Sequence, residues 1–518
     1  MTDKKHILMV AAENDFLPGA KVGGVADVLR DLPPALVKQG QSVDVVVPSY
    51  GFLARLPGLR TVAEFDVHFA GFGQRVMLLK TEQSNGGAVN YIMHSPALAP
   101  KGETVYCNDS YGPFATDATK FAFFCACIAK ALSEGIFPRP DVIHCHDWHS
   151  AFLLILLRFL PELEAFGNIR SVYTIHNLAM QGVRPFRDDD SSFESWYPSL
   201  HYNGQLICDL HNPHCVNPMR AAILLADKIH TVSATYADEI LQTSDHANGI
   251  FGGEGLESDL CVRAQQGDLL GIINGSEYPK GARYAAPAKK KVLSLAQNAL
   301  VLWASKQSHM SSAHFVAEKR LQHWALKKTR GFTLTSVGRV TDQKVRLLAT
   351  FVAPGKTALE AMLDSLGDKG QFILLGSGEQ HYEEFLLGVS GRHENLIFLN
   401  GYSHELSLNL YRYGDLFVMP SSFEPCGISQ MLSMRAGQPC LANQVGGLKD
   451  TIKSNVTGFC FAGENAVAQA KALVEAFNQA KTLYETKPEQ WKKIATAAAD
   501  VRFTWEQSAR QYVEQLYA

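Results

Sequence analysis

The sequence has no cysteine pair in CxxC spacing, no long hydrophobic run and no excess of either charge. Ten cysteines are scattered through 518 residues, which is typical of reduced, buried thiols and predicts a cytoplasmic protein. The amino-terminal residues lead into a strand-like segment without the apolar stretch of a signal peptide. The longest apolar runs, residues 121–129 and 151–157, are less than half a membrane span, so we expect buried helices and no membrane contact.

The balance of charge argues against a nucleic-acid partner. Lys and Arg number 48 and Asp and Glu 51, which gives a net charge of −3. A protein that binds nucleic acid needs cations in excess on one face to neutralise phosphates. We therefore expect anions to be recognised only locally, in a globular chain of ordinary composition, with 46% hydrophobic and 19% charged residues.

The length exceeds what one hydrophobic core usually serves, so two domains are expected. Short apolar runs bounded by turn residues recur along the chain, with helix-period segments between them. Because runs that are apolar on both faces are typical of parallel strands covered by helices, the fold class is α/β with two doubly wound sheets. The expected strands are residues 6–12, 42–48, 141–146, 171–176, 228–233, 269–274, 332–338, 371–376, 395–400, 415–420 and 438–442.

We expect a Rossmann-like N-terminal domain over residues 1–265 and a second one over residues 266–500. Residues 501–518 are expected to form a helix, capped by Thr504, that packs back on the first domain. Pro33 should interrupt the helix that carries Val25 and Leu32.

The stretch over residues 278–328 is less regular. It is interpreted as the entry to the second domain plus a surface excursion, with one helix over residues 313–327.

Two segments favour recognition of an anion. In residues 21–27 (KVGGVAD) two glycines at a helix start let backbone amides approach a phosphate, and Lys21 adds positive charge, although a tight turn would need the same glycines. In residues 338–344 (GRVTDQK) Arg339 and Lys344 follow a predicted strand, where open α/β sheets bind ligands. Two cations there could neutralise a diphosphate without a metal, although a lone charged loop is usually only solvated.

A third segment, residues 422–429 (SFEPCGIS), places a carboxylate at a helix entrance. Glu424 could bind sugar hydroxyls while the amides of Cys426, Gly427 and Ile428 hold phosphate oxygens. The alternative is an ordinary helix cap.

Histidines gather at two strand ends, in residues 144–149 (HCHDWH) and 174–177 (TIHN). A metal-binding HxHxDH pattern needs a residue between the second His and the Asp, whereas here Asp147 follows His146 directly. We therefore expect neutral, hydrogen-bonding imidazoles and no metal. Residues 188–190 (DDD) contain a D-x-D, which is interpreted as a solvated charge run.

Taken in order, these motifs resemble those of the glycogen synthase and starch synthase family of retaining glycosyltransferases. The resemblance covers nearly the whole chain and extends through NPMRAAILLADKIHTVSATYADEI, GIINGSE, LLGSGE, NGYSHE, QVGGLKDT and FTWEQSARQYVEQL. It implies the GT-B architecture, in which two Rossmann-like domains face a central cleft. It also implies ADP-glucose as the donor, an α-1,4-glucan (glycogen or a maltooligosaccharide) as the acceptor, and no metal or other cofactor.

The resemblance implies a role for each motif residue. His176 would lie near the glucose 6-hydroxyl, Arg339 and Lys344 would stabilise the leaving ADP, and Glu424 would hold the 3- and 4-hydroxyls. Residues of the first domain that would contact the glucose or the diphosphate are Lys21, Gly23, Gly24, Asp147, His176 and Asn177. Residues of the second that would bind the donor, with Tyr402 stacked on the adenine, are Arg339, Lys344, Tyr402, Glu424, Cys426, Gly427, Ile428 and Ser429.

Some positions depart from the family pattern. The family has Thr where Val22 stands and Gly where Val345 stands, so UDP-glucose or another acceptor remains an alternative. Related families carry a second Glu eight residues after the first; here that position is Leu432, as in starch and bacterial glycogen synthases.

The rival functions are a catalytically weak, glucan-binding regulatory protein and a hydrolase or phosphorylase. A catalytically weak, glucan-binding regulatory protein would be expected to lack some of the motif residues. A glycosidase needs two suitably spaced carboxylates.

The aromatic residues 193–202 could stack on glucan rings or pack in the core.

Overall fold

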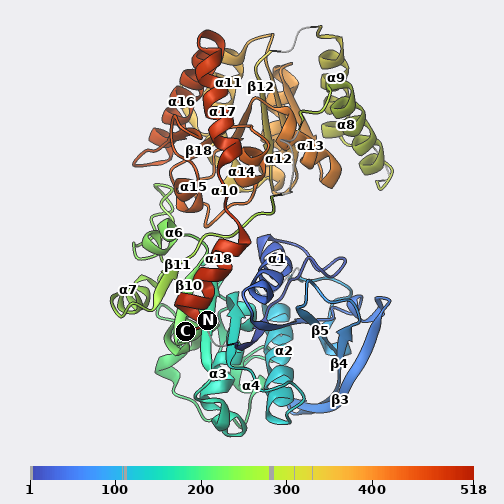
Figure 1. The fold of residues 1–518 in the computed structure, drawn as a ribbon, viewed down its shortest axis with the longest axis vertical. Helices are drawn as coiled ribbons and strands as arrows, with labels where there is room; N and C mark the ends of the chain where they lie inside the picture. The colour runs from blue at the N-terminus through green and yellow to red at the C-terminus, as the bar shows by residue number, and fades with distance from the viewer. Residues whose placement is uncertain (1–3, 108, 110–113, 279–284, 308–309, 329–330) are drawn as a thin grey trace. The chain divides into compact units, whose positions relative to one another are not determined.

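The computed structural model describes residues 4–107, 109, 114–278, 285–307, 310–328 and 331–518. The chain forms two compact units (Figure 1). The first comprises Met1–Ser244, Gly252–Gly275 and Thr504–Ala518, and the second comprises Asp245–Phe251 and Ser276–Phe503. Each unit contains a large sheet covered by helices, which confirms the α/β class.

The first unit is built on a nine-stranded sheet in the order β11-β10-β7-β6-β1-β2-β5-β4-β3. The pairs from β11 to β5 are parallel, and β4 runs antiparallel to both β5 and β3. Its strands are β1 (His6–Val10), β2 (Ser42–Pro48), β3 (Leu59–Phe69), β4 (Phe72–Thr81), β5 (Val89–His94), β6 (Val142–His146), β7 (Arg170–Ile175), β10 (Lys228–Thr231) and β11 (Leu269–Gly271). A separate ribbon pairs β8 (Arg184–Pro185) with β9 (Cys215–Val216).

Helix α1 and the C-terminal segment pack on one face of this sheet, where Val28, Leu32, Trp505 and Tyr512 share one core. The helices of the unit are α1 (Gly24–Lys38), α2 (Ala115–Ser133), α3 (Asp147–Phe159), α4 (Phe193–Trp196), α5 (Pro218–Leu225), α6 (Ala234–Glu239), α7 (Glu257–Gln265), α18 (Trp505–Gln511) and a π-helical turn, Tyr512–Leu516. Short 3₁₀ turns occupy Leu53–Arg55, Pro96–Leu98, Pro161–Phe166 and Gly204–Leu206.

The second unit has a six-stranded parallel sheet in the order β16-β15-β12-β17-β18-β19. Counted along the chain this is 3-2-1-4-5-6, the order of dinucleotide-binding folds, and the order reverses between β12 and β17. The strands are β12 (Thr333–Val337), β15 (Gln371–Gly376), β16 (Leu396–Asn400), β17 (Leu416–Met419), β18 (Cys440–Asn443) and β19 (Gly458–Phe461). A small hairpin joins β13 (Phe351–Ala353) to β14 (Lys356–Thr357).

Alternate residues of these strands face two helical layers. Phe372 and Leu374 pack with α10, α11, α12, α16 and α17, whereas Ile373 and Leu375 pack with α8, α9 and α13. The helices are α8 (Lys289–Ala304), α9 (Ser312–Leu326), α10 (Asp342–Ala349), α11 (Ala358–Leu366), α12 (Gln380–Arg392), α13 (His404–Tyr413), α14 (Ser429–Arg435), α15 (Gly446–Thr451), α16 (Ala466–Thr486) and α17 (Pro488–Asp500).

The prediction that Pro33 interrupts the first helix is wrong. Helix α1 runs to Lys38 with Pro33 and Pro34 inside it. Proline removes an amide that would have bonded the carbonyl four residues earlier. The side chain of Asn85 replaces the amide lost at Pro34, because its Nδ2 donates to the Arg30 carbonyl at 2.5 Å.

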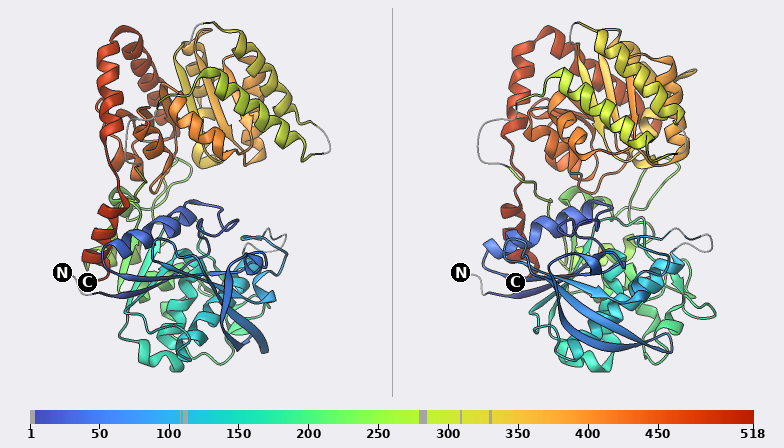
Figure 2. Two further views of the ribbon diagram at one scale, coloured as in Figure 1. Left: turned by 45° about the vertical axis from the view of Figure 1, so that its right-hand side comes forward. Right: turned by 90° about the vertical axis from the view of Figure 1, so that its right-hand side faces the viewer.

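The expectation for residues 278–328 was incomplete. Besides α9, the segment forms a second helix, α8, which begins at Lys289 and lies beside α9 (Figures 1 and 2). Thr504 caps the C-terminal helix as predicted, in a capping box with Gln507.

All ten cysteines are free thiols. Among the described residues, no helix combines the length and the apolar character needed to cross a membrane.

Candidate functional site

Loops that follow β12 and β17 meet at the point where the second sheet reverses its strand order. Lys344, in the first turn of α10, contacts the Glu424 carboxylate through its ammonium and donates to Ser421 Oγ at 3.2 Å. Ser421 Oγ donates in turn to Glu424 Oε2 at 2.9 Å. Gln343 Nε2 donates to the Phe423 carbonyl at 2.7 Å and ties the loops together again. The structure thus brings Lys344 and Glu424, both predicted from motifs, into direct contact.

Arg339 lies at the same strand end, and its guanidinium has no ion-pair partner among the described residues. The residue is exposed and makes no hydrogen bond or ion pair with any described residue. Glu424 is 8% exposed, and only its Oε2 accepts hydrogen bonds from the described part of the chain. The loops therefore present a cation and a carboxylate oxygen that are available to a ligand.

The turn between Glu424 and α14 is shaped by glycine. Gly427 has φ of 75°, which a residue with a side chain rarely adopts. No described residue accepts a hydrogen bond from the amides of Gly427 or Ile428. Cys426 is buried, and Ser429 begins α14 with its Oγ 3.0 Å from the Tyr411 hydroxyl. The predicted phosphate-binding donors thus include amides without a partner in the described chain.

Sequence reasoning gave no role to the glycines of α15, which support this turn. Gly446 has φ of 41°, and a Cβ on it would collide with the Glu424 carbonyl. The Gly447 amide donates to the same carbonyl at 3.0 Å. The signal that could have found them is the GG pair in QVGGLKDT, which follows a predicted strand as the KVGG pair does.

Tyr402 lies on the loop after β16, two strands away from β12 in the sheet. Its side chain is 64% exposed. Its hydroxyl lies 3.4 Å from His404 Nδ1, and Ser403 caps α13.

In the first unit a carboxylate of the chain itself occupies the start of α1. The amides of Val22 and Gly23 both donate to Glu13 Oε2 at 2.6 Å, and the Tyr106 hydroxyl donates to Oε1 at 2.6 Å. Gly23 is the N-cap residue and Gly24 the first helical residue, exposed and with open space at its Cα. The anion that these amides bind here is therefore Glu13, which the motif analysis missed.

Lys21 is held in ion pairs rather than standing free. Its ammonium lies 2.6 Å from Asp27 and 3.3 Å from Asp15, and Arg30 pairs with the same two carboxylates. Partial burial lowers the pKa of Lys21, but the bond and charge of Asp27 outweigh it and leave the pKa raised. Lys21 would have to leave these partners to reach a phosphate.

Asp147 organises the loop after β7. It adopts φ of 53° at the start of α3, and its Oδ1 accepts the amides of His176 at 2.7 Å and Asn177 at 3.4 Å. Burial raises the pKa of Asp147 to about 7, and the charge of Glu13 adds to the rise. Three predicted residues, Asp147, His176 and Asn177, are therefore brought together.

His176 belongs to a buried cluster of neutral imidazoles. His146 Nδ1 lies 3.0 Å from His176 Nε2, and the ring of His144 stacks on that of His146 with 4.2 Å between centroids. Burial lowers the pKa of His176 to about 3. Throughout the described residues no set of three or more His, Cys, Asp or Glu side chains is arranged to hold a metal ion.

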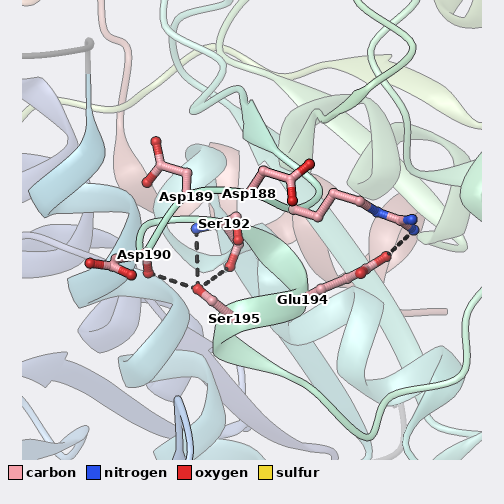
Figure 3. Close-up of a pocket in the computed structure, with 7 residues that line it drawn as sticks. Asp188, Asp189, Asp190, Ser192, Glu194 and Ser195 are labelled. Atoms are coloured by element: carbon pink, nitrogen blue, oxygen red, sulfur yellow. Dashed lines mark hydrogen bonds and ion pairs between the residues drawn. The ribbon is translucent and has the colours of Figure 1, made fainter.

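The D-x-D segment forms the wall of a separate surface hollow of about 740 Å³ (Figure 3). Asp189 pairs with Arg184 at 2.9 Å and accepts the Ser191 amide at 2.6 Å. Ser195 Oγ donates to the Asp190 carbonyl at 2.7 Å. These contacts fix the loop, and the hollow contains none of the predicted site residues.

The aromatic residues 193–202 pack inward. Phe193 and Trp196 are fully buried, and the ring of Tyr202 stacks on Phe186 at 5.6 Å. Core packing, rather than stacking on a glucan, explains Phe193 and Trp196.

The two departures from the family pattern lie in different surroundings. Val22 is 50% exposed, whereas Val345 is 2% exposed, in the core of the second unit.

Comparisons with known proteins agree across the chain. Residues 6–261 match the model of the starch synthase catalytic domain, and residues 325–498 match the model of glycosyl transferases group 1. Glycogen synthases of Lachnospira eligens and Clostridioides difficile are 30% and 32% identical to this chain. The first match covers 99% of both chains and the second covers 96% of both.

Solved structures give the same result. The catalytic domain of starch synthase IV from Arabidopsis thaliana, bound to ADP and acarbose, superposes with a TM-score of 0.74 at 26% identity and covers 99% of both chains. A sucrose-phosphate synthase from Thermosynechococcus elongatus, at 17% identity, has a TM-score of 0.54 with 99% and 98% covered, and shares the fold. The predicted GT-B class is confirmed. The chain belongs to the glycogen synthase and starch synthase family of glycosyltransferases, which use nucleotide-sugar donors.

Proposed function

We propose that the protein is a glycogen synthase that transfers glucose from ADP-glucose to the non-reducing end of an α-1,4-glucan and retains the α configuration. The observation that carries the proposal is the contact of Lys344 with Glu424 at the switch point of the second sheet, beside Arg339, which has no ion-pair partner among the described residues. Ligands of open α/β sheets bind at such switch points. Ten free cysteines fit the cytoplasmic location that we propose.

Charge development on the leaving group explains the two cations. As the bond from glucose C1 to the phosphate oxygen breaks, negative charge grows on ADP, and Arg339 and Lys344 stabilise it. The amides of Gly427 and Ile428 donate to phosphate oxygens. Because the cations supply the countercharge, the scheme needs no metal.

Glu424 is proposed to orient the sugar rather than to attack it. Its Oε2 is already bound by Lys344 and Ser421, whereas Oε1 remains to accept the 3- and 4-hydroxyls of glucose. Attack then comes from the acceptor on the face that ADP leaves. The C1–phosphate bond breaks, the new bond to the glucan 4-oxygen forms, and the 4-hydroxyl proton passes to the departing phosphate oxygen.

Residues of the first unit are proposed to hold the glucose. His176 is neutral, and its Nε2 faces His146 Nδ1, so Nδ1 of His176 is left for the 6-hydroxyl. His146 Nε2 is buried without a partner among the described residues, and a bare acceptor there is less costly than an orphaned N–H. His146 then donates to His176, which carries its own proton on Nδ1 and donates it to the sugar.

The test is incorporation of radiolabelled glucose into glycogen by the purified protein, with ADP-glucose and UDP-glucose compared at equal concentration. The proposal predicts incorporation from ADP-glucose that is faster than from UDP-glucose and insensitive to a chelator. Incorporation from neither donor would support a glucan-binding regulatory protein instead, and a preference for UDP-glucose would overturn the choice of donor.

A further inference from the structure

Helices α8 and α9 form a hairpin whose side chains hold the end of β16. Trp303, near the end of α8, donates its indole N–H to the Tyr402 carbonyl at 3.0 Å. His314, in the first turn of α9, places Nε2 3.0 Å from the Asn400 carbonyl. Because a carbonyl only accepts, Nε2 of His314 carries the proton. Two donors of one hairpin thus fix two carbonyls on either side of Gly401.

Gly401 is adapted to this contact. A Cβ at this position would lie 2.5 to 2.8 Å from Cε2, Cδ2 and Cζ2 of the Trp303 ring. The indole therefore packs directly on the backbone of the residue before Tyr402. Trp303 and His314 also support each other, since their rings lie 5.8 Å apart.

The hairpin that carries these side chains is anchored firmly. Leu300 of α8 and Leu321 of α9 are buried in one core with Ile397 and Leu399 of β16. This core holds the indole against the end of β16. Val301 and Leu302, which lie between Leu300 and Trp303 in α8, are exposed.

Tyr402 needs such support to bind a flat ligand. Its side chain is 64% exposed, and among the described residues its hydroxyl contacts only His404, at 3.4 Å. An aromatic side chain on an unsupported loop loses conformational freedom when a base stacks on it, and this loss weakens binding. A backbone that is already fixed reduces the loss.

We propose that Trp303 is a positioning residue for the donor, which holds the Gly401–Tyr402 backbone so that Tyr402 is ready to stack on the base of the nucleotide. The inference rests on the proposed function, because it takes the ligand to be an adenine nucleotide. Trp303 itself is not required to touch the nucleotide. Its effect is confined to donor affinity, and the chemistry on glucose and the binding of glucan do not depend on it.

The experiment measures ADP binding by calorimetry, and KM and kcat for donor and glucan, in the full chain. Trp303→Phe keeps a ring on Gly401 and removes the hydrogen bond. We expect Kd for ADP and KM for the donor to rise together by roughly 3- to 10-fold, with kcat and KM for glucan unchanged. Leu302→Ala, one residue away and exposed, is the matched control and leaves all four values unchanged.

A double-mutant cycle separates positioning from a general structural effect. Tyr402→Ala is expected to weaken ADP binding by roughly 10-fold, and adding Trp303→Phe to it then changes nothing further. Gly401→Ala, which pushes the loop off the indole, should reproduce the Trp303→Phe effect.

Each contrary outcome has one meaning. An unchanged Kd in Trp303→Phe, or a loss that persists in full in the Tyr402→Ala background, overturns the inference. A wild-type protein that neither binds ADP nor transfers glucose from ADP-glucose overturns the proposed function instead.

Discussion

The ammonium of Lys344 contacts the carboxylate of Glu424, and this pair joins the loops that follow β12 and β17. Side chains 80 positions apart in sequence are thereby fixed on either side of the point where the strand order reverses. The pair leaves Arg339 as a separate cation at the same strand end. Arg339 and Lys344 should therefore respond differently to substitution.

Arg339→Ala should lower kcat by at least about 100-fold without changing the melting temperature. The side chain is exposed and has no partner in the described chain, so its removal breaks no contact of the fold. The activity lost is that of a charge proposed to stabilise the leaving group. Steady-state kinetics and thermal unfolding check this, and kcat close to that of the wild type would contradict the role.

Lys344→Ala should reduce both activity and stability. It leaves the Glu424 carboxylate, which is 8% exposed, with Ser421 as its only donor among the described residues, and removing one partner of a buried ion pair destabilises by at most about 3–5 kcal/mol. Combining it with Glu424→Gln should recover much of the stability but none of the activity. Denaturation and kinetics of the single and double variants decide this, since a double variant that stays unstable would show that the pair is not the cause.

Asp147 should make stability depend on pH in an identifiable direction. Burial raises its pKa from the ordinary 3.8 to about 7, so between these values the folded state holds a proton that the unfolded state has lost. The free energy of unfolding contributed by this group therefore falls as pH rises through that window. Asp147→Asn keeps an oxygen for the amides of His176 and Asn177 and removes the titration.

The free energy of unfolding of Asp147→Asn should exceed that of the wild type by an amount that grows from about pH 4 to pH 8, to at most about 4 kcal/mol. Amide hydrogen exchange in β6 and β7, compared between the variant and the wild type across this pH range, measures the same difference in stability locally. Asp188→Asn, on the exposed loop, is the control and should give no such trend. A difference independent of pH would mean that Asp147 is already ionised at acidic pH.

Acid should destabilise the first unit through its buried histidines. Burial lowers the pKa of His149, His176 and His230 to about 3, and those of His144 and His146 well below 6.5. Below the ordinary 6.5 the unfolded chain gains protons that the folded state resists, so the free energy of unfolding falls as the pH drops from 6.5 towards 3. Exchange protection of β6 should fall over that range, and protection that stays constant would contradict the neutral cluster.

Asn85→Ala should destabilise α1 by about 1 kcal/mol, because it removes the donor that satisfies the Arg30 carbonyl beside Pro34. Thermal unfolding measures the loss. Ser84→Ala, at the exposed neighbouring position, serves as the control. Equal melting temperatures for Asn85→Ala and the wild type would show that water replaces the Asn85 side-chain amide as the donor to the Arg30 carbonyl.

Strand ends were predictable from the sequence because they follow continuous apolar runs. The structure accordingly has Arg339 and Glu424 in the segments that follow β12 and β17, and Lys344 in the first turn of α10. Strand β3 (Leu59–Phe69) was missed because one face is exposed, so that its apolar residues alternate with polar ones. The length of α1 was misjudged because the donor that compensates for Pro34 comes from Asn85, in the turn between β4 and β5.

The features that could not be predicted from the sequence are contacts between residues far apart in the chain. Glu13 has no motif of its own, and its partner Tyr106 lies 93 residues away. The hairpin contact of Trp303 with Tyr402 spans 99 residues, and a helix start that is rich in lysine gives little sign of it. Sequence patterns report local periodicity, whereas these contacts are created only by packing.

Basic groups and turn amides at the switch point of the second sheet are proposed to bind the donor diphosphate. The most direct measurement is a crystal structure of the protein with ADP. We expect phosphate oxygens within hydrogen-bond distance of Arg339, Lys344 and the amides of Gly427 and Ile428. Diphosphate bound elsewhere, with Arg339 still in solvent, would contradict it.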